Sequence, residues 1–133
     1  MFMSQRLKIF LVITIPFFAI VHYLGCWRYY YYIEGYDKLV HILAGASVVL
    51  VVYWFLEEIA PKTNKQLISL IALFFIALGW EVYEYLIDHF IDPYLVLSPR
   101  QMGPIDTLTD FLAAFAGAIV ILIWLYLKER KKG

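Results

Sequence analysis

The sequence is poor in cysteine and in charge, and each shortage excludes a class of protein. Cys26 is the one cysteine in 133 residues, so an intrachain disulfide and a cysteine-based metal motif are both excluded. Charged residues make up only 17% of the chain and the formal net charge is zero, so no strong positive field is available to bind nucleic acid. The sequence also contains no Gly-x-Ser-x-Gly nucleophile motif and no CDP-alcohol transferase motif.

Apolar residues are correspondingly abundant. They make up 63% of the chain, which is more apolar side chain than a water-soluble core of this size can bury. A helix needs about 20 mostly apolar residues to cross the hydrocarbon core of a membrane. Four stretches meet this requirement, at 7–26, 38–56, 66–87 and 107–127. The sequence therefore predicts an all-α polytopic membrane protein, a four-helix transmembrane bundle that forms a single domain over residues 1–133.

The first stretch has a second interpretation, as a signal peptide. Arg6 and Lys8 lie at its start, as basic residues precede the apolar core of such a peptide. However, its apolar run is longer than that of a typical signal peptide, and Leu24-Gly25-Cys26 is only a fragment of a lipoprotein cleavage site. We therefore expect a transmembrane helix here.

The distribution of lysine and arginine predicts the orientation of the chain in the plasma membrane, because these residues accumulate in cytoplasmic segments. Most of them lie on the side of the two termini, namely Arg6, Lys8, Lys62, Lys65, Lys128, Arg130, Lys131 and Lys132. The opposite side has only Arg28, Lys38 and Arg100. We therefore expect both termini to be cytoplasmic, and the segments 27–37 and 88–105 to face outward.

Acidic and histidine side chains gather at the outward ends of the predicted spans. They form pairs spaced i and i+3 or i and i+4, so that the members of a pair share a helix face. The pairs are Asp37 with His41, Glu81 with Glu84, and Asp106 with Asp110. Because such groups are costly in lipid, they normally face the interior of a helix bundle. We therefore expect the three pairs to converge on one cavity that opens to the outer leaflet.

A cavity of this kind would hold five carboxylates and one imidazole. Either several carboxylates stay protonated, or cations neutralise them. Arg28, Lys38 and Arg100 are available as partners, and a divalent metal ion is the other solution. The ligand types suit Mg²⁺, Mn²⁺, Zn²⁺ or Fe²⁺ without choosing among them, and helix bundles do hold such sites. The candidate metal ligands are Asp37, His41, Glu81, Glu84, Asp106 and Asp110.

A structural interpretation competes for two of the six. Asp37 and Asp106 stand where a helix N-cap is expected, and aspartate is a common N-cap residue. The two roles are compatible, so both stay open for these residues. The other four candidates lie at least one turn inside their helices, where a functional role is favoured.

Small residues in the second and fourth spans predict that these two helices pack together. Ala44-Gly45-Ala46-Ser47 lies in the second span, and the fourth contains Gly117 among several alanines. Small residues let membrane helices approach closely. The contact would bring the pair at Asp37 near the pair at Asp106.

These motifs resemble those of a known family. The segments Asp37-Lys-Leu-Val-His41, Trp80-Glu-Val-Tyr-Glu84 and Asp106-Thr-Leu-Thr-Asp110 resemble the YjdF-like integral membrane proteins. More distantly, the Asp-Lys-x-x-His opening of a span is similar to the VanZ-like family. The resemblance covers residues 36–120 and implies a compact multi-span membrane protein. Because most members have no assigned reaction, it supports the choice of residues without supplying a reaction.

Three functions fit these features. The first, which we prefer, is a metal-dependent hydrolase or transferase that acts on a membrane lipid or a lipid-linked substrate at the outer leaflet. Its catalytic groups would be Glu84, His41 and Asp110, and Arg100 and Arg28 would bind the substrate phosphate. The second is a non-catalytic membrane module that binds lipid or a partner and modifies the cell envelope. The third is a small cation transporter, which with four spans would need to form a homodimer.

Overall fold

The computed structural model describes residues 3–25, 33–91 and 103–130. This part of the chain contains four helices, namely α1 (Gln5–Leu24), α3 (Tyr36–Ile59), α4 (Lys65–Phe90) and α6 (Pro104–Arg130). All four are long and apolar enough to cross a membrane, which confirms the predicted all-α transmembrane bundle. Large apolar side chains also cover its outside, with Phe75 64% exposed and Val120 66% exposed, as expected of a surface that faces lipid.

Each helix begins where the local chemistry favours a helix start. Ser4 Oγ accepts a hydrogen bond from the backbone N–H of Leu7 in α1, and Asn64 caps α4 in the same way. Before α3, Gly35 takes a left-handed conformation with φ 77°, which favours glycine. The N-cap interpretation of Asp37 is therefore wrong, because Gly35 occupies that position.

The first residue of α6 is Pro104, whose fixed φ suits the first position of a helix. Asp106 therefore lies inside the first turn of α6, and the N-cap interpretation is wrong for it too. The carboxylate still lies near the positive end of the helix dipole, where a negative charge is stabilised.

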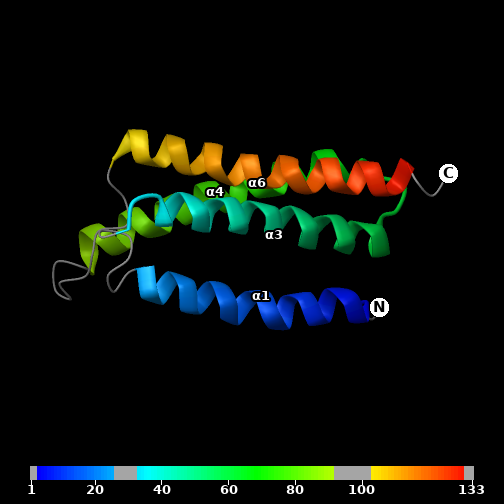
Figure 1. Cartoon of the computed structure of the whole chain (residues 1–133), viewed down its shortest axis with the longest axis horizontal. Helices are drawn as coiled ribbons and strands as arrows, with labels where there is room; N and C mark the ends of the chain where they lie inside the picture. The colour runs from blue at the N-terminus through cyan, green and yellow to red at the C-terminus, as the bar shows by residue number, and fades with distance from the viewer. Residues whose placement is uncertain (1–2, 26–32, 92–102, 131–133) are drawn as a thin grey trace.

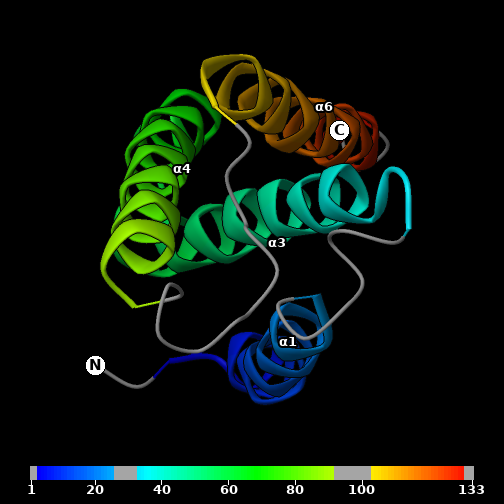
Figure 2. The same cartoon turned by 90° about the vertical axis from the view of Figure 1, so that its left-hand side faces the viewer.

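The helix α3 lies at the centre of the bundle. It packs most extensively against α6, next against α4, and on its far side against α1 (Figures 1 and 2). In the view along the bundle, α1 lies apart from α4 and α6 (Figure 2), and it packs mainly against α3. Every helix is therefore anchored through α3, and α1 is the least embedded of the four.

Successive helices run in opposite directions, so the bundle has two chemically different ends. The end where α1 starts and α6 finishes is called the terminal end, and the opposite end, where α3 and α6 start, is called the polar end (Figure 1). At the terminal end, Leu7, Tyr53 and Trp54 form a buried cluster with neighbouring leucines. Arg6 pairs there with Glu57 at 2.7 Å, which ties α1 to α3.

The predicted contact between the second and fourth spans is confirmed as the contact between α3 and α6. A Cβ atom added at Gly45 would overlap the backbone carbonyl of Ala114, and one added at Gly117 would overlap the carbonyl of Ile42. The two backbones therefore touch at both glycines, as is common where small residues line a membrane helix contact. This close approach sets the distance between the polar residues that follow.

Candidate functional site

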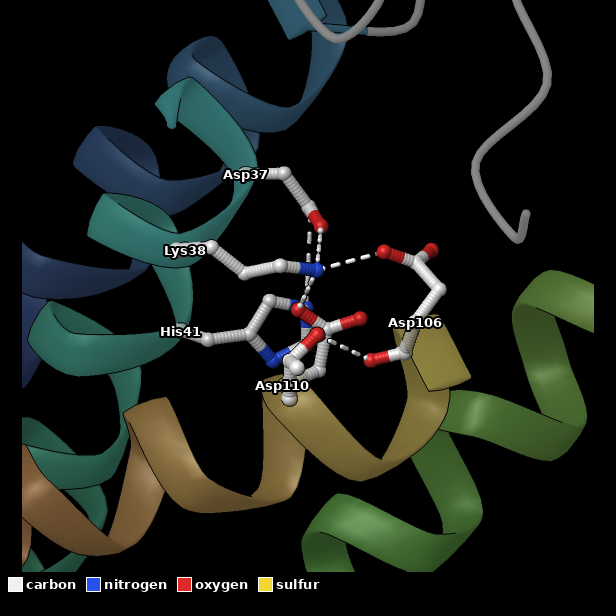
Figure 3. Close-up of polar contacts among 6 residues, drawn as sticks. Asp37, Lys38, His41, Asp106 and Asp110 are labelled. Atoms are coloured by element: carbon white, nitrogen blue, oxygen red, sulfur yellow. Dashed lines mark hydrogen bonds and ion pairs between the residues drawn. The ribbon is translucent and has the colours of Figure 1, made fainter. Parts of the chain in front are cut away.

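The first part of the site is a cluster of three aspartates around one lysine, Asp37, Lys38, Asp106 and Asp110, which we call the aspartate–lysine cluster (Figure 3). Lys38 Nζ donates to Asp106 Oδ1 at 2.5 Å and to Asp110 Oδ1 at 2.6 Å. It also donates to Asp37 Oδ2 at 3.1 Å. One ammonium group thus joins α3 to α6, and its charge offsets part of the negative charge of the three carboxylates.

His41 lies one turn below this cluster on α3 and is buried. Its Nε2 atom is 3.5 Å from Asp37 Oδ1 and 3.8 Å from Asp110 Oδ1. The two carboxylates therefore face one edge of the imidazole from two different helices (Figure 3). A carboxylate beside one ring nitrogen is the arrangement that orients a histidine so that the other nitrogen can bind a ligand.

The second part of the site is the group His41, Glu81 and Glu84, which we call the glutamate–histidine cluster. Each residue offers one ligand atom, and the three atoms lie within 4.8 Å of one another. Glu81 is 4% exposed and Glu84 is 1% exposed. Among the described residues, Glu81 Oε2 and Glu84 Oε1 are buried atoms with no hydrogen-bond partner. Buried polar atoms without partners are rare in native proteins and call for an explanation such as an ion or a proton.

The spacing along the helices explains how these groups meet. Asp37 and His41 share one face of α3, and this face turns toward α6 because Gly45, one turn further along, carries the close contact. Glu81 and Glu84 lie on the inward face of α4, whose outward face carries exposed residues such as Val82 and Tyr85. The histidine therefore stands where α3, α4 and α6 meet.

The structure brings all six predicted ligands to the polar end, although not around a single point. Within the part of the chain that the structure describes, two sets have the spacing of a metal site, the glutamate–histidine cluster and the set Asp37, His41 and Asp110. Asp106 belongs to neither set and instead accepts from Lys38. Arg28 and Arg100, the predicted phosphate ligands, lie outside the described residues.

The central position of Lys38 among the three aspartates was not predicted from the sequence. In the sequence it is one of three available counter-charges, together with Arg28 and Arg100. The signal that could have selected it is its position next to Asp37, at the same end of α3 as the start of α6.

A cavity of about 360 Å³ extends from His41 into the bundle, between α1, α3 and α4. Its walls are mostly apolar, and His22 of α1 and Trp80 of α4 lie at its polar end. These two rings contact each other edge to face with centroids 4.9 Å apart. Trp80, the first residue of the motif Trp80-Glu-Val-Tyr-Glu84, therefore lines the cavity. The spacing Leu11, Thr14, Phe18 and His22 was the signal for the α1 wall, because it places these residues on one helix face.

Comparison with known proteins narrows the identity to a family. The search of curated proteins and the search of solved structures each found no match. The likeness to the VanZ-like family stays a prediction, whereas the YjdF-like resemblance is confirmed at the level of the family. A family model described as a predicted membrane protein, DUF2238, matches residues 2–131, which is nearly the whole chain, so the protein belongs to this family of membrane proteins.

Proposed function

We propose that the protein binds a divalent metal ion at His41, Glu81 and Glu84 and uses it to hydrolyse or transfer a group of a membrane lipid or lipid-linked substrate. The observation that carries the proposal is the pair of buried, unpartnered carboxylate oxygens on Glu81 and Glu84, next to a buried imidazole. Carboxylate and imidazole ligands from facing helices are a known way to hold such ions in a helix bundle.

The charge balance of the polar end supports a bound cation. Five carboxyl groups gather there, whereas Lys38 and His41 are the basic side chains that contact them among the described residues. Lys38 is already engaged by the three aspartates. Among the described residues, neither glutamate pairs with a lysine or an arginine, and His41 is the basic group beside them. A metal ion or protons would therefore compensate their charge, because both carboxylates are buried.

The residues around the proposed ion would have different roles. Glu81, Glu84 and His41 would supply the ligands, and the ion would activate water or polarise a phosphoryl oxygen. Asp110 and Asp37 face His41 Nε2 and would orient the ring, with Asp110 next to Lys38 as the candidate general base. Arg28 and Arg100 remain proposed ligands of a substrate phosphate.

The position of the site favours a lipid as substrate. The glutamates lie near the end of a 26-residue helix, α4, which is longer than the hydrocarbon core requires. Their depth therefore matches the region below the headgroups, and the lysine and arginine distribution predicts that this region belongs to the outer leaflet. The neighbouring cavity has mostly apolar walls, which suit the apolar part of a lipid better than a water-soluble substrate.

The first test is a metal analysis of the protein purified in detergent. We expect about one divalent ion per chain by inductively coupled plasma mass spectrometry, and its loss in the double variant Glu81→Gln/Glu84→Gln. Asp88→Asn is the matched control, because Asp88 lies one turn beyond Glu84 on the same helix but outside both potential metal sets. Equal metal contents in the double variant and the wild type would contradict the proposed ligands.

The second candidate function is the non-catalytic module, and Lys38 is the observation that favours it. Lys38 already donates to three aspartates, so the aspartate–lysine cluster has a counter-charge without a metal ion. Absence of metal from the purified wild type, with unfolding unchanged by a chelator, would move the assignment to this candidate. If metal is found, loss of lipid phosphate turnover in Glu84→Gln would support the enzyme instead.

The transporter is the least supported of the three. Between the two ends of the bundle, the described helices carry no ionisable side chain over residues 42–52, 70–80 and 111–124. A cation crossing this layer would find no charged ligand along the way. Uptake of a cation into proteoliposomes would nevertheless revive this function.

A further inference from the structure

The cavity beside His41 has the dimensions and direction of a lipid chain. It follows α3 from Val40 to Val52. Over this distance the helix rises about 18 Å at 1.5 Å per residue. One leaflet contributes about 15 Å, half of the hydrocarbon thickness of about 30 Å. The volume of about 360 Å³ also lies within the range of ligand-binding pockets.

The helix α1 forms one wall and is fastened mainly at its two ends. At the terminal end, Ser4 N donates to Glu58 Oε2 at 3.1 Å and Phe10 packs edge to face on Trp54. At the polar end, Tyr36 Oη donates to the carbonyl oxygen of Val21 at 2.7 Å, next to the contact of His22 with α4. The cavity lies between these two attachments, where α1 stands away from α4 (Figure 2).

The two ends of the cavity differ in chemistry. Its polar end is formed by His22, His41 and Trp80, and His41 also belongs to the glutamate–histidine cluster. Its deeper part is lined by residues such as Val51, Val52 and Leu11. An amphiphile fits this arrangement, because its polar group would reach the site while its chain remained in apolar surroundings.

We propose that this cavity binds one alkyl chain of a membrane lipid, laid parallel to the helices, with the lipid's polar group at the glutamate–histidine cluster. The inference rests on the proposed function and names its substrate class, a chain-bearing lipid that enters sideways between α1 and α4. The bilayer supplies this occupant at high local concentration, so no soluble carrier is needed.

The test uses the purified protein in phosphatidylglycerol vesicles that contain some phosphatidylglycerol with a diazirine on one acyl chain. After photolysis, mass spectrometry maps the labelled residues. We expect label on Val40 and Leu73, which line the cavity and are only 7% and 2% exposed, in addition to label on outward residues such as Ile119. Label restricted to outward residues would overturn the proposal.

Filling the cavity tests the assignment directly. In Ala77→Trp the new ring would occupy the space of several methylene groups, so label on Val40 should fall about tenfold. Ala116→Trp is the matched control, because the same substitution there projects from the exposed face of α6. Ala44→Phe, from the α3 wall, serves if Ala77→Trp does not fold. Unchanged label on Val40 in a folded cavity-filling variant would contradict a bound chain.

The same variants separate this inference from the metal site. Glu81→Gln/Glu84→Gln should lose the ion and keep the label, whereas Ala77→Trp should keep the ion and lose the label. Failure of one proposal therefore leaves a different signature from failure of the other. Native mass spectrometry tests the alternative that a second copy of the chain fills the cavity. If the wild type is a dimer and Ala77→Trp is a monomer, the cavity is a dimer interface and the proposal of a bound lipid chain is contradicted.

Discussion

At the scale of single residues, Lys38 is the group that holds the polar end together. Its ammonium bonds carboxylates on both α3 and α6, and Asp110, one of these partners, is 1% exposed. Removing one partner of a buried ion pair leaves an uncompensated charge, which costs more than the pair itself contributes. The lysine is therefore expected to matter for stability whether or not a metal ion binds next to it.

We predict that Lys38→Met lowers the free energy of unfolding in detergent by about 3 kcal/mol, the lower end for a broken buried pair because Lys38 is partly exposed. The control is Lys62→Met in the exposed turn between α3 and α4, which should change stability by less than about 0.5 kcal/mol. The double variant Lys38→Met/Asp110→Asn should recover part of the loss, since it removes one of the charges left behind. A Lys38→Met variant as stable as the wild type would show that the aspartates do not need the lysine.

At the scale of the helices, the contact between α3 and α6 decides where the polar groups meet. Gly45 and Gly117 allow each backbone to touch the other, and the same contact continues into a buried cluster with Val49, Ala114 and Ala118. Because these residues of α3 and α6 are small or β-branched, the two helices can lie close along this stretch. Separating them would move His41 and Asp110, which face each other across the contact, away from one another.

We predict that Gly45→Ala destabilises the protein by about 3 kcal/mol, the upper range for overpacking, because the new methyl group would meet backbone that cannot rotate away. Gly79→Ala is the matched control, because a Cβ there meets nothing within 4 Å. In that helix interior, alanine should be neutral or more stable by about 0.5–1 kcal/mol. Thermal unfolding in detergent measures both variants, and equal stability of the two would contradict the close contact.

At the scale of the whole molecule, the two ends of the bundle carry different charges. At the terminal end, Arg6 pairs with Glu57 and Lys65 pairs with Glu129, which also accepts a hydrogen bond from Tyr53. The polar end is dominated by carboxylates. This asymmetry agrees with the bias of lysine and arginine toward the side of the termini, from which the cytoplasmic orientation was predicted.

We predict that a green fluorescent protein fused after Gly133 is fluorescent and that alkaline phosphatase at the same point is inactive, because the lysine and arginine bias predicts a cytoplasmic terminal end. A cysteine introduced at Lys62, with Cys26 changed to serine, should resist a membrane-impermeant thiol reagent in intact cells. The control is the same reagent after permeabilisation, which should then label the cysteine. Active phosphatase together with labelling in intact cells would reverse the orientation and place the polar end inside.

The class of protein, the number of membrane helices and the residues that share a helix face could all be predicted from the sequence alone. These properties are local, because crossing the bilayer depends on about 20 consecutive residues and face sharing depends on spacing along one helix. Convergence of the three polar pairs at one end also followed from the sequence, because successive spans must reverse direction.

Which charges pair, and where a cavity remains, depends on how the helices pack against one another and could not be predicted from the sequence. The choice of Lys38 over other cations depends on the rotation of α3 against α6, which Gly45 and Gly117 set through a backbone contact. The division into an aspartate–lysine and a glutamate–histidine cluster depends on the side from which α4 approaches. The cavity arises because α1 is fastened at its ends and stands away from α4 between them. The distances between helices are set by many weak contacts acting together. They therefore cannot be predicted from any short stretch of sequence.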